Sequence, residues 1–181
     1  MNTRAKKAEG WKSLSLTEYL AELPRGFNPF SIIGDEWMLI GAGTAEDWNA
    51  MTASWGGLGV LWNHTVATCY VRPTRHTFSY MERSERFTLS FLGAGHRKAL
   101  NYFGSHSGRD GDKAVKGGLS PICFEDGTVS FAEARFVFSC RKLYAQDLNP
   151  SSFIDPSLEQ NYPEKDYHRM YVGEIERVWR G

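Results

Sequence analysis

The sequence predicts a mainly β fold, a small barrel of about six antiparallel strands with short helices at its periphery. Short segments rich in β-branched and aromatic residues recur along the chain, turn residues separate them, and the helical patterns between them are brief. With 181 residues, the chain has the length of one domain with a substantial core, so we assign residues 1–181 to a single domain.

The N-terminal part predicts three features. Residues 1–12 are basic and have no apolar pattern, which is typical of a flexible arm. Ser15 and Glu18 have the spacing of a capping box, so we expect a short helix over residues 16–23 that ends before a proline. Residues 28–43 contain two apolar runs separated by a Gly-Asp pair, which favours a hairpin.

The rest of the chain predicts strands, two short helices and one long loop. A helix is expected over Thr77–Arg83 and another over His96–Phe103, with Gly104 as its stop. Residues 104–118 are polar and glycine-rich, which indicates a functional or mobile loop. Strands are expected near residues 50–54, 66–71, 86–92, 129–143 and 168–178.

The expected strand over residues 129–143 has an unusual pattern. Its apolar phase starts on Val129 and Phe131 and then shifts to Phe136, Phe138 and Cys140. A change of phase inside one strand predicts a bulge or a sharp bend.

Composition and charge exclude several classes of protein. The 21 basic residues balance the 21 acidic ones, so the chain lacks the charge expected of a nucleic-acid or membrane-surface binder. No apolar segment has the length of a membrane span, and no secretory signal is evident. Three widely spaced cysteines without a CxxC pair indicate a reducing compartment, and we expect the cytoplasm. The five histidines show no metal-ligand spacing, so no metal site is expected.

Residues 49–63, N-A-M-T-A-S-W-G-G-L-G-V-L-W-N, combine small, polar and aromatic side chains. Small residues such as Ala53 and the two glycines after Trp55 allow a ligand to lie against the main chain. Asn49, Thr52 and Ser54 are uncharged hydrogen-bonding groups that suit the edge of a heterocycle. Trp55 and Trp62 either stack on an aromatic ligand or are core or interface residues.

A second polar stretch, Y-V-R-P-T-R-H-T, covers residues 70–77. Pro73 ends the preceding strand, and Arg75, His76 and Thr77 stand at the start of a predicted helix. Arginine side chains and the backbone amides of a helix N-terminus together form a good phosphate site. The two stretches therefore indicate a planar heterocycle that carries a phosphate, as FMN does.

Five blocks in order resemble the flavin reductase-like family, whose members fold as FMN-binding split β-barrels of Greek-key type. They are N-A-M-T-A-S-W-G-G-L-G-V-L-W, Y-V-R-P-T-R-H-T, F-T-L-S-F, S-G-R-D-G-D-K and H-R-M-Y-V-G-E-I-E, and they cover roughly residues 27–178. The family commonly has a tyrosine where this chain has His76. The resemblance implies that the FMN-binding residues are Asn49, Thr52, Ala53, Ser54 and Trp55 along the ring and ribityl chain, Arg75, His76 and Thr77 by the phosphate, Ser90 and Phe91 under the ring, and Ser107 and Lys113 in the glycine-rich loop.

The resemblance also implies a reaction. We expect an oxidoreductase that takes hydride from NADH or NADPH onto flavin and passes electrons to free flavin or another acceptor. His168 would lie by the nicotinamide or flavin, although a surface histidine at a strand edge is the other interpretation. The resemblance implies a homodimer as well.

Two further functions stay open at this stage. One is an FMN-carrying electron-transfer protein resembling flavoredoxin, reduced by a protein partner. The other is an enzyme of the pyridoxamine phosphate oxidase type, which the N-A-M-T-A-S-W block fits less well. A flavin-binding protein without catalytic activity would be compatible with the same residues.

Overall fold

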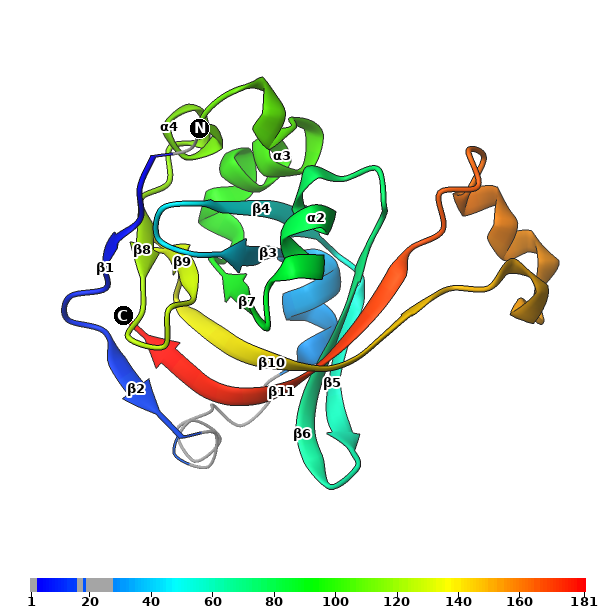
Figure 1. The fold of residues 1–181 in the computed structure, drawn as a ribbon, viewed down its shortest axis with the longest axis horizontal. Coiled ribbons are helices and arrows are strands. Elements are labelled where there is room, and N and C mark those ends of the chain that lie inside the picture. The colour runs from blue at the N-terminus through cyan, green and yellow to red at the C-terminus, as the bar shows by residue number, and fades with distance from the viewer. Residues whose placement is uncertain (1–2, 16–17, 19–27) are drawn as a thin grey trace.

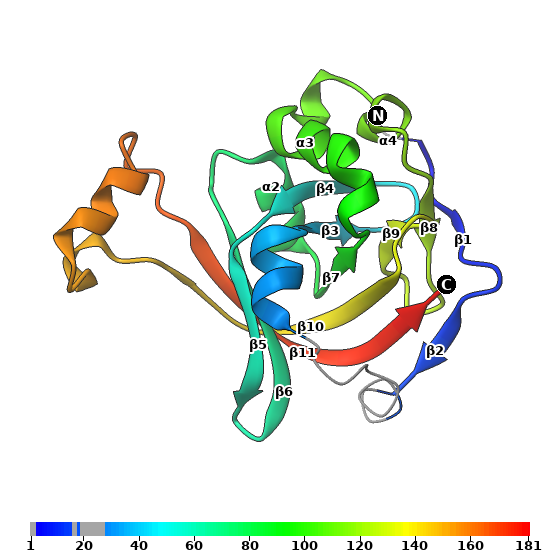
Figure 2. The ribbon, with the colours of Figure 1, turned by 180° about the vertical axis from the view of Figure 1, so that it is seen from behind.

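The computed structural model describes residues 3–15, 18 and 28–181. Its main element is a strongly curved antiparallel sheet with the strand order β4-β3-β7-β10-β11-β6-β5, and β2 pairs with β11 (Figures 1 and 2). The two edge strands, β4 and β5, are consecutive in the chain, so the two ends of the sheet come together where one passes into the other. The mainly β fold with short peripheral helices is confirmed. The strands are β2 Lys12–Leu14, β3 Met38–Gly43, β4 Trp48–Ala53, β5 Gly56–Leu61, β6 His64–Val71, β7 Arg86–Phe91, β10 Phe136–Asp147 and β11 Arg169–Arg180.

A small second sheet and two short helices cover one outer side of the curved sheet, whereas a third helix contributes Tyr80 and Met81 to the core inside the barrel (Figure 1). The helices are α2 His76–Arg83, α3 Arg97–Ser105 and α4 Lys113–Gly117. The second sheet consists of β1 Lys6–Lys7, β8 Pro121–Cys123 and β9 Val129–Phe131, with β8 in the middle. None of the helices in the described ranges has the length and apolar composition that crossing a membrane requires.

Period-two alternation along the strands divides the apolar side chains between two cores. On β3, Met38 and Ile40 point into the barrel, while Leu39 between them packs on the outer side with Trp48 and Phe103. The outer core is what holds α3, α4 and the small sheet in place. Of these elements, α3, α4 and the segment between them contribute one wall of the site described below.

The phase change in residues 129–143 separates these two cores. Val129 and Phe131 belong to β9 and pack in the outer core, whereas Phe136, Phe138 and Cys140 belong to β10 and pack inside the barrel. The segment therefore forms two strands, β9 and β10, instead of one. In addition, the pairing of β10 with β11 shifts in register after Ser139 and after Lys142. We expected a bulge or a sharp bend within one strand, whereas the structure has two separate strands here and the register shifts lie further along β10.

Three other expectations need correction. Residues 29–35 form a helical segment instead of the first strand of a hairpin, because the Asn28 side chain accepts from the amides of Phe30 and Ser31 and so starts a helical turn. The expected flexible arm over residues 1–12 is instead paired from Lys6 onward through β1 and β2. The expected loop over residues 104–118 contains the end of α3 and the whole of α4.

The capping-box prediction is confirmed at its two side chains. The Ser15 amide donates to the Glu18 carboxylate at 2.7 Å, and the Glu18 amide donates to the Ser15 hydroxyl at 3.2 Å. The helix expected over residues 16–23 lies, apart from Glu18, outside the described residues. The helices expected at 77–83 and 96–103 are confirmed, although α3 continues through Gly104 to Ser105.

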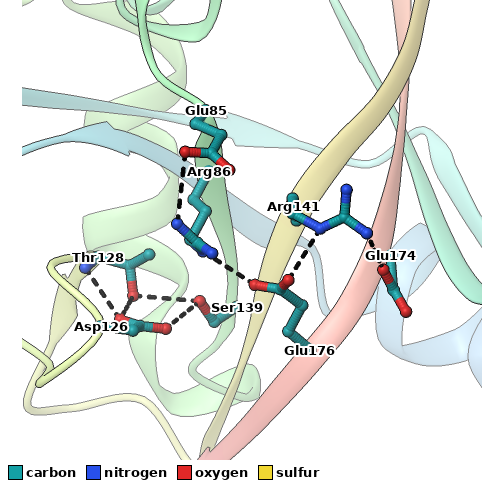
Figure 3. A network of polar contacts seen from close by, with 8 residues as sticks. All are labelled: Glu85, Arg86, Asp126, Thr128, Ser139, Arg141, Glu174 and Glu176. Carbon is teal, nitrogen blue, oxygen red and sulfur yellow. Dashed lines mark hydrogen bonds and ion pairs between the residues drawn. The ribbon is translucent and has the colours of Figure 1, made fainter.

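A polar network on the long strands joins β7, β10 and β11 (Figure 3). Glu176 on β11 accepts from Arg86 at 2.8 Å and from Arg141 at 2.9 Å, and Arg141 also bonds Glu174. These side chains are partly exposed, so each pair stabilises the fold only weakly. None of them lines the groove described next, so we assign the network a structural role.

Candidate functional site

Three adjoining cavities form one groove along the region where β4 passes into β5. The polar cavity has a volume of about 170 Å³, the middle cavity about 210 Å³ and the apolar cavity about 660 Å³. Met51 and Arg75 line both the polar and the middle cavity. Ser54, Trp55 and Tyr70 line both the middle and the apolar cavity. The groove therefore changes from polar to apolar along its length.

The polar cavity is formed by β4, the N-terminus of α2 and the segment that links α3 to α4. No side chain caps the N-terminus of α2, so the first amides of the helix are left for another acceptor. This is the feature that the R-P-T-R-H-T stretch predicted. The lining residues are Asn49, Met51, Thr74, Arg75, His76, Thr77, Ser105, His106, Ser107, Gly108, Arg109 and Lys113.

A buried cation, Lys113, and a half-buried one, Arg75, meet at this cavity. Arg75 donates to the carbonyl of Gly104 at 2.7 Å, and Lys113 donates to the carbonyls of Ala50 and Phe103, each at 2.9 Å. Burial, and then the charge of Arg75, lower the pKa of Lys113 to about 7. Burial and the charge of Arg72 lower the pKa of Arg75 as well. Since the described lining residues include no carboxylate, the cavity favours an anion.

Two polar atoms beside the same cavity are buried without a partner in the described structure. They are Asn49 Oδ1 and His76 Nδ1, whereas Asn49 Nδ2 donates to the Thr77 hydroxyl at 2.8 Å. Burial, and then the charges of Arg109 and Lys113, lower the pKa of His76. A Cβ on Gly108 would lie 2.3 Å from Asn49 Oδ1, so only glycine allows the loop to approach β4 so closely.

The middle cavity has main-chain groups on one side. Ser54 and Trp55 lie between β4 and β5, outside both ladders, so their amides are not used in strand pairing. Ala53 is buried beside them. The Thr52 hydroxyl donates to the carbonyl of Leu100 and so ties β4 to α3.

His168 also lines the middle cavity, beside Trp55. Its ring lies 5.1 Å from the Trp55 ring, centroid to centroid, and its Nδ1 lies 2.9 Å from the Tyr162 hydroxyl. Burial, and then the charge of Arg72, lower the pKa of His168 to about 4, so the ring is neutral at pH 7. A buried hydroxyl proton without an acceptor is costly, so we assign Tyr162 as the donor to Nδ1. His168 then carries its proton on Nε2.

The structure brings most of the predicted residues to the groove but places two elsewhere. Ser90 is fully buried in the outer core, where its hydroxyl meets that of Ser130 at 2.7 Å. Phe91 is stacked on Phe136 inside the barrel, with 4.7 Å between the ring centroids. Neither residue lines any of the three cavities, so the structure does not bring these two predicted residues to the groove. The F-T-L-S-F block builds the barrel instead.

The glycines after Trp55 also have a structural role, apart from making room for a ligand. A Cβ on Gly56 would lie 2.8 Å from the Thr68 carbonyl and 2.9 Å from the Met38 side chain, so this glycine lets β5 close against the barrel. Trp62, with φ of 52°, stands with Asn63 in the two-residue turn between β5 and β6. Trp62 is exposed there and lines none of the cavities of the groove.

Sequence reasoning did not find Tyr162, Tyr70 and Arg72 as residues of the groove. Arg72 stood in the recognised Y-V-R-P-T-R-H-T stretch, but its guanidinium binds Asp166 at 2.6 Å and the Asn161 carbonyl at 2.7 Å. It thereby anchors residues 148–168. From here on, we use the word arm for this segment alone, and not for residues 1–12. This segment projects from the body between β10 and β11 (Figure 1). No local pattern pairs the arm with β6, so only the fold could show this contact.

Comparison with protein families gives a direct assignment. Residues 31–181 match the family described as flavin reductase like domain. The chain belongs to this family. The matched range contains all three cavities apart from Pro29 and Phe30 at the rim of the apolar one. Membership of the flavin reductase-like family supports a flavin-related oxidoreductase.

Solved structures show the same fold at low sequence identity. An FMN-binding protein from Thermus thermophilus with bound p-hydroxybenzaldehyde is 22% identical, with a TM-score of 0.63 over 88% of this chain and 80% of that one. Flavoredoxin of Desulfovibrio vulgaris is 18% identical, with a TM-score of 0.63 over 88% and 76%. An NADH:FAD oxidoreductase from Streptomyces globisporus is 18% identical, with a TM-score of 0.62 over 81% and 75%. No curated protein sequence matches the chain significantly.

Proposed function

We propose that this flavin reductase-like protein binds FMN along the groove, takes hydride from NADH or NADPH, and passes electrons to free flavin or another acceptor. The observation that carries the proposal is the polar cavity, in which the buried Lys113, the half-buried Arg75 and an uncapped helix N-terminus meet without a carboxylate among the described lining residues. These groups fit a phosphate dianion. The middle cavity then offers the adjoining place for the flavin ring.

Each part of the groove has a definite task in this proposal. Arg75, His76, Thr77, Ser107 and Lys113 hold the phosphate end. Asn49, whose Oδ1 is buried without a partner, accepts from a hydroxyl of the ribityl chain. The residues beside the ring are Thr52, Ala53, Ser54 and Trp55.

Bound FMN would supply the ring that accepts and donates hydride. The chain itself supplies donors for the negative charge of the reduced ring. The amides of Ser54 and Trp55 are outside the ladders, and the Ser54 hydroxyl is beside them. His168 offers a neutral Nε2–H at pH 7 and so needs no change of protonation to donate. We propose His168 as the catalytic residue.

We also propose that the protein is a homodimer. Large apolar side chains are exposed on the β5–β6 hairpin, where Val60 is 76% and Trp62 56% exposed, and on the arm, where Ile154 is 97% exposed. Apolar surface of this kind is typical of an interface between subunits. A second copy would cover both places.

A second candidate function is that of an FMN-carrying electron-transfer protein that resembles flavoredoxin and exchanges electrons with a protein partner. One observation favours it: the apolar cavity has no cationic side chain among its described lining residues to hold the diphosphate of a nicotinamide dinucleotide. In that case FMN would be reduced by a redox protein.

An absorbance experiment separates these functions. The purified protein is mixed with FMN, and spectra are recorded anaerobically before and after addition of NADH or NADPH. Shifted flavin bands that bleach with nicotinamide support the reductase. Shifted bands that bleach only with dithionite support the electron carrier. The absence of any shift would contradict both functions.

A further inference from the structure

The apolar cavity is the largest in the groove and has no role in holding FMN as proposed above. Its volume of about 660 Å³ lies within the range of small-molecule sites in proteins. One wall is the helical segment 29–35 with the start of β5, and the other is the arm. Figure 2 shows the helical segment beside β5.

The chemistry of the lining is uniform. No lysine, arginine, histidine, aspartate or glutamate lines the cavity in the described part of the chain. Five of the lining side chains are aromatic, namely Phe30, Trp55, Tyr70, Phe153 and Tyr162. Aromatic side chains bind planar apolar molecules through the faces and edges of their rings.

The arm that forms the outer wall is held in place by specific contacts. Arg72 binds Asp166 and the Asn161 carbonyl, and its guanidinium lies 5.0 Å from the centre of the Tyr162 ring. Tyr162 is in turn hydrogen bonded to His168 and stacked with Phe153 at 6.0 Å. The cavity is therefore bounded on both sides by residues with defined positions.

Polar groups stand at one end of the cavity. Ser54, Trp55 and Tyr70 line both the apolar and the middle cavity, so the hydroxyls of Ser54 and Tyr70 stand at the junction. A ligand with an apolar ring and one carbonyl or hydroxyl group would direct that polar group towards the junction, and hence towards the flavin ring.

We propose that the apolar cavity binds a small, neutral, planar aromatic molecule beside the flavin ring. The position beside the ring rests on the proposed function, whereas the binding itself does not. An anionic molecule of the same shape should bind more weakly, because no described lining residue of the cavity carries a charge to compensate the loss of its hydration, and Arg72 at the middle cavity is already paired with Asp166. The phosphate-bearing tail of a dinucleotide must therefore lie outside this cavity.

The test compares two molecules with the same two-ring skeleton, neutral 2-acetonaphthone and anionic 2-naphthoate. Binding of each to the full-length protein is measured by equilibrium dialysis, with and without FMN. We expect the ketone to bind and the carboxylate to bind about tenfold or more weakly. Equal binding of both, or no binding of the ketone, would overturn the proposal.

Substitutions on both walls locate the site. Leu158→Glu changes the arm and Phe30→Glu the opposite wall, and both side chains are exposed enough, 44% and 85%, for folding to tolerate the change. Each should weaken ketone binding about tenfold or more. Val115→Glu is the matched control, since Val115 is 70% exposed and does not line the cavity. Binding that is unchanged in both wall variants would refute the assignment.

Two further measurements, sedimentation and the FMN absorbance shift, distinguish the alternative explanations. If a second copy of the chain fills the cavity instead, Leu158→Glu will change the sedimentation coefficient while the parent fails to bind the ketone, which also overturns the proposal. If the flavin proposal fails, FMN will show no absorbance shift, yet the ketone will still bind and respond to the wall variants. If the inference fails while the flavin proposal holds, FMN will show an absorbance shift and the ketone will not bind.

Discussion

The two ends of the groove differ in what they can recognise. The polar cavity is small and is lined by the buried Lys113 and the half-buried Arg75, with no carboxylate among its described lining residues, so it selects a ligand by charge. The apolar cavity is about four times larger and has no charged lining residue in the described chain, so it selects by shape and hydrophobicity. We infer that retention of the cofactor depends on one end and choice of the reaction partner on the other.

The largest expected effect concerns the charge of the polar cavity. Arg75→Ala removes a charge-assisted contact with the phosphate and should weaken FMN binding by about 1.5–3 kcal/mol, which is about 10- to 150-fold. Fluorescence titration of FMN measures the dissociation constant. Arg177→Ala, at an exposed position of β11 outside the groove, is the control. If Arg75→Ala binds FMN as tightly as the parent, the phosphate assignment is wrong.

The next effect is a pH dependence that only the polar end should cause. With its pKa lowered to about 7, Lys113 loses its proton as the pH rises above neutrality, while the phosphate dianion favours the charged form. FMN affinity should therefore fall by up to about tenfold per pH unit between pH 7 and 9, with proton uptake on binding. Calorimetry in buffers of different ionisation enthalpy measures that uptake.

Lys113→Met should remove the pH dependence, and Lys116→Met, at an exposed position of the same helix, should leave it unchanged. The stability of the FMN-free protein gives an independent check. The folded pKa of Lys113 lies below its ordinary value of 10.5, so the unfolded state binds more protons between the two values. The free energy of unfolding should thus rise as the pH increases from 7, by up to about 1.4 kcal/mol per unit. A proton uptake that survives Lys113→Met would assign the titration to another group.

A smaller effect is expected at the middle cavity. His168→Ala should leave the dissociation constant of FMN unchanged and slow flavin reduction by about tenfold, because it removes a neutral donor beside the ring and no phosphate contact. Stopped-flow absorbance under anaerobic conditions measures the rate. A loss of FMN affinity without a change in rate would reassign His168 to cofactor binding.

The smallest effect should come from Tyr162→Phe, which keeps the ring and removes the hydroxyl. Without that donor to Nδ1, His168 should no longer be held as the Nε2–H form, and the reduction rate should fall by a few-fold. ¹⁵N NMR of the histidine ring distinguishes the two neutral forms directly. An unchanged spectrum in the variant would show that Tyr162 does not set the protonation site.

Local patterns in the sequence were sufficient for the polar end. Arg75, His76 and Thr77 are adjacent in the chain at a helix start, and Asn49 to Trp55 are one continuous stretch, so their types and order already indicated a phosphorylated heterocycle. The same approach did not show where Ser90 and Phe91 lie. A strand residue faces one side or the other by the phase of pairing, and both sides of β7 are buried here, with Phe91 inside the barrel and Ser90 against Ser130 of β9.

The sequence by itself thus determined the mainly β class, most of the strands and the charged half of the groove, because strand patterns and helix-start chemistry act over a few residues. Only the tertiary structure decided which strands form which core, where residues 3–14 are paired, and that the arm forms the outer wall of the apolar cavity. The physical reason is sequence distance. Arg72 and Asp166, or Trp55 and His168, meet only after the barrel has closed, and no local pattern encodes that contact.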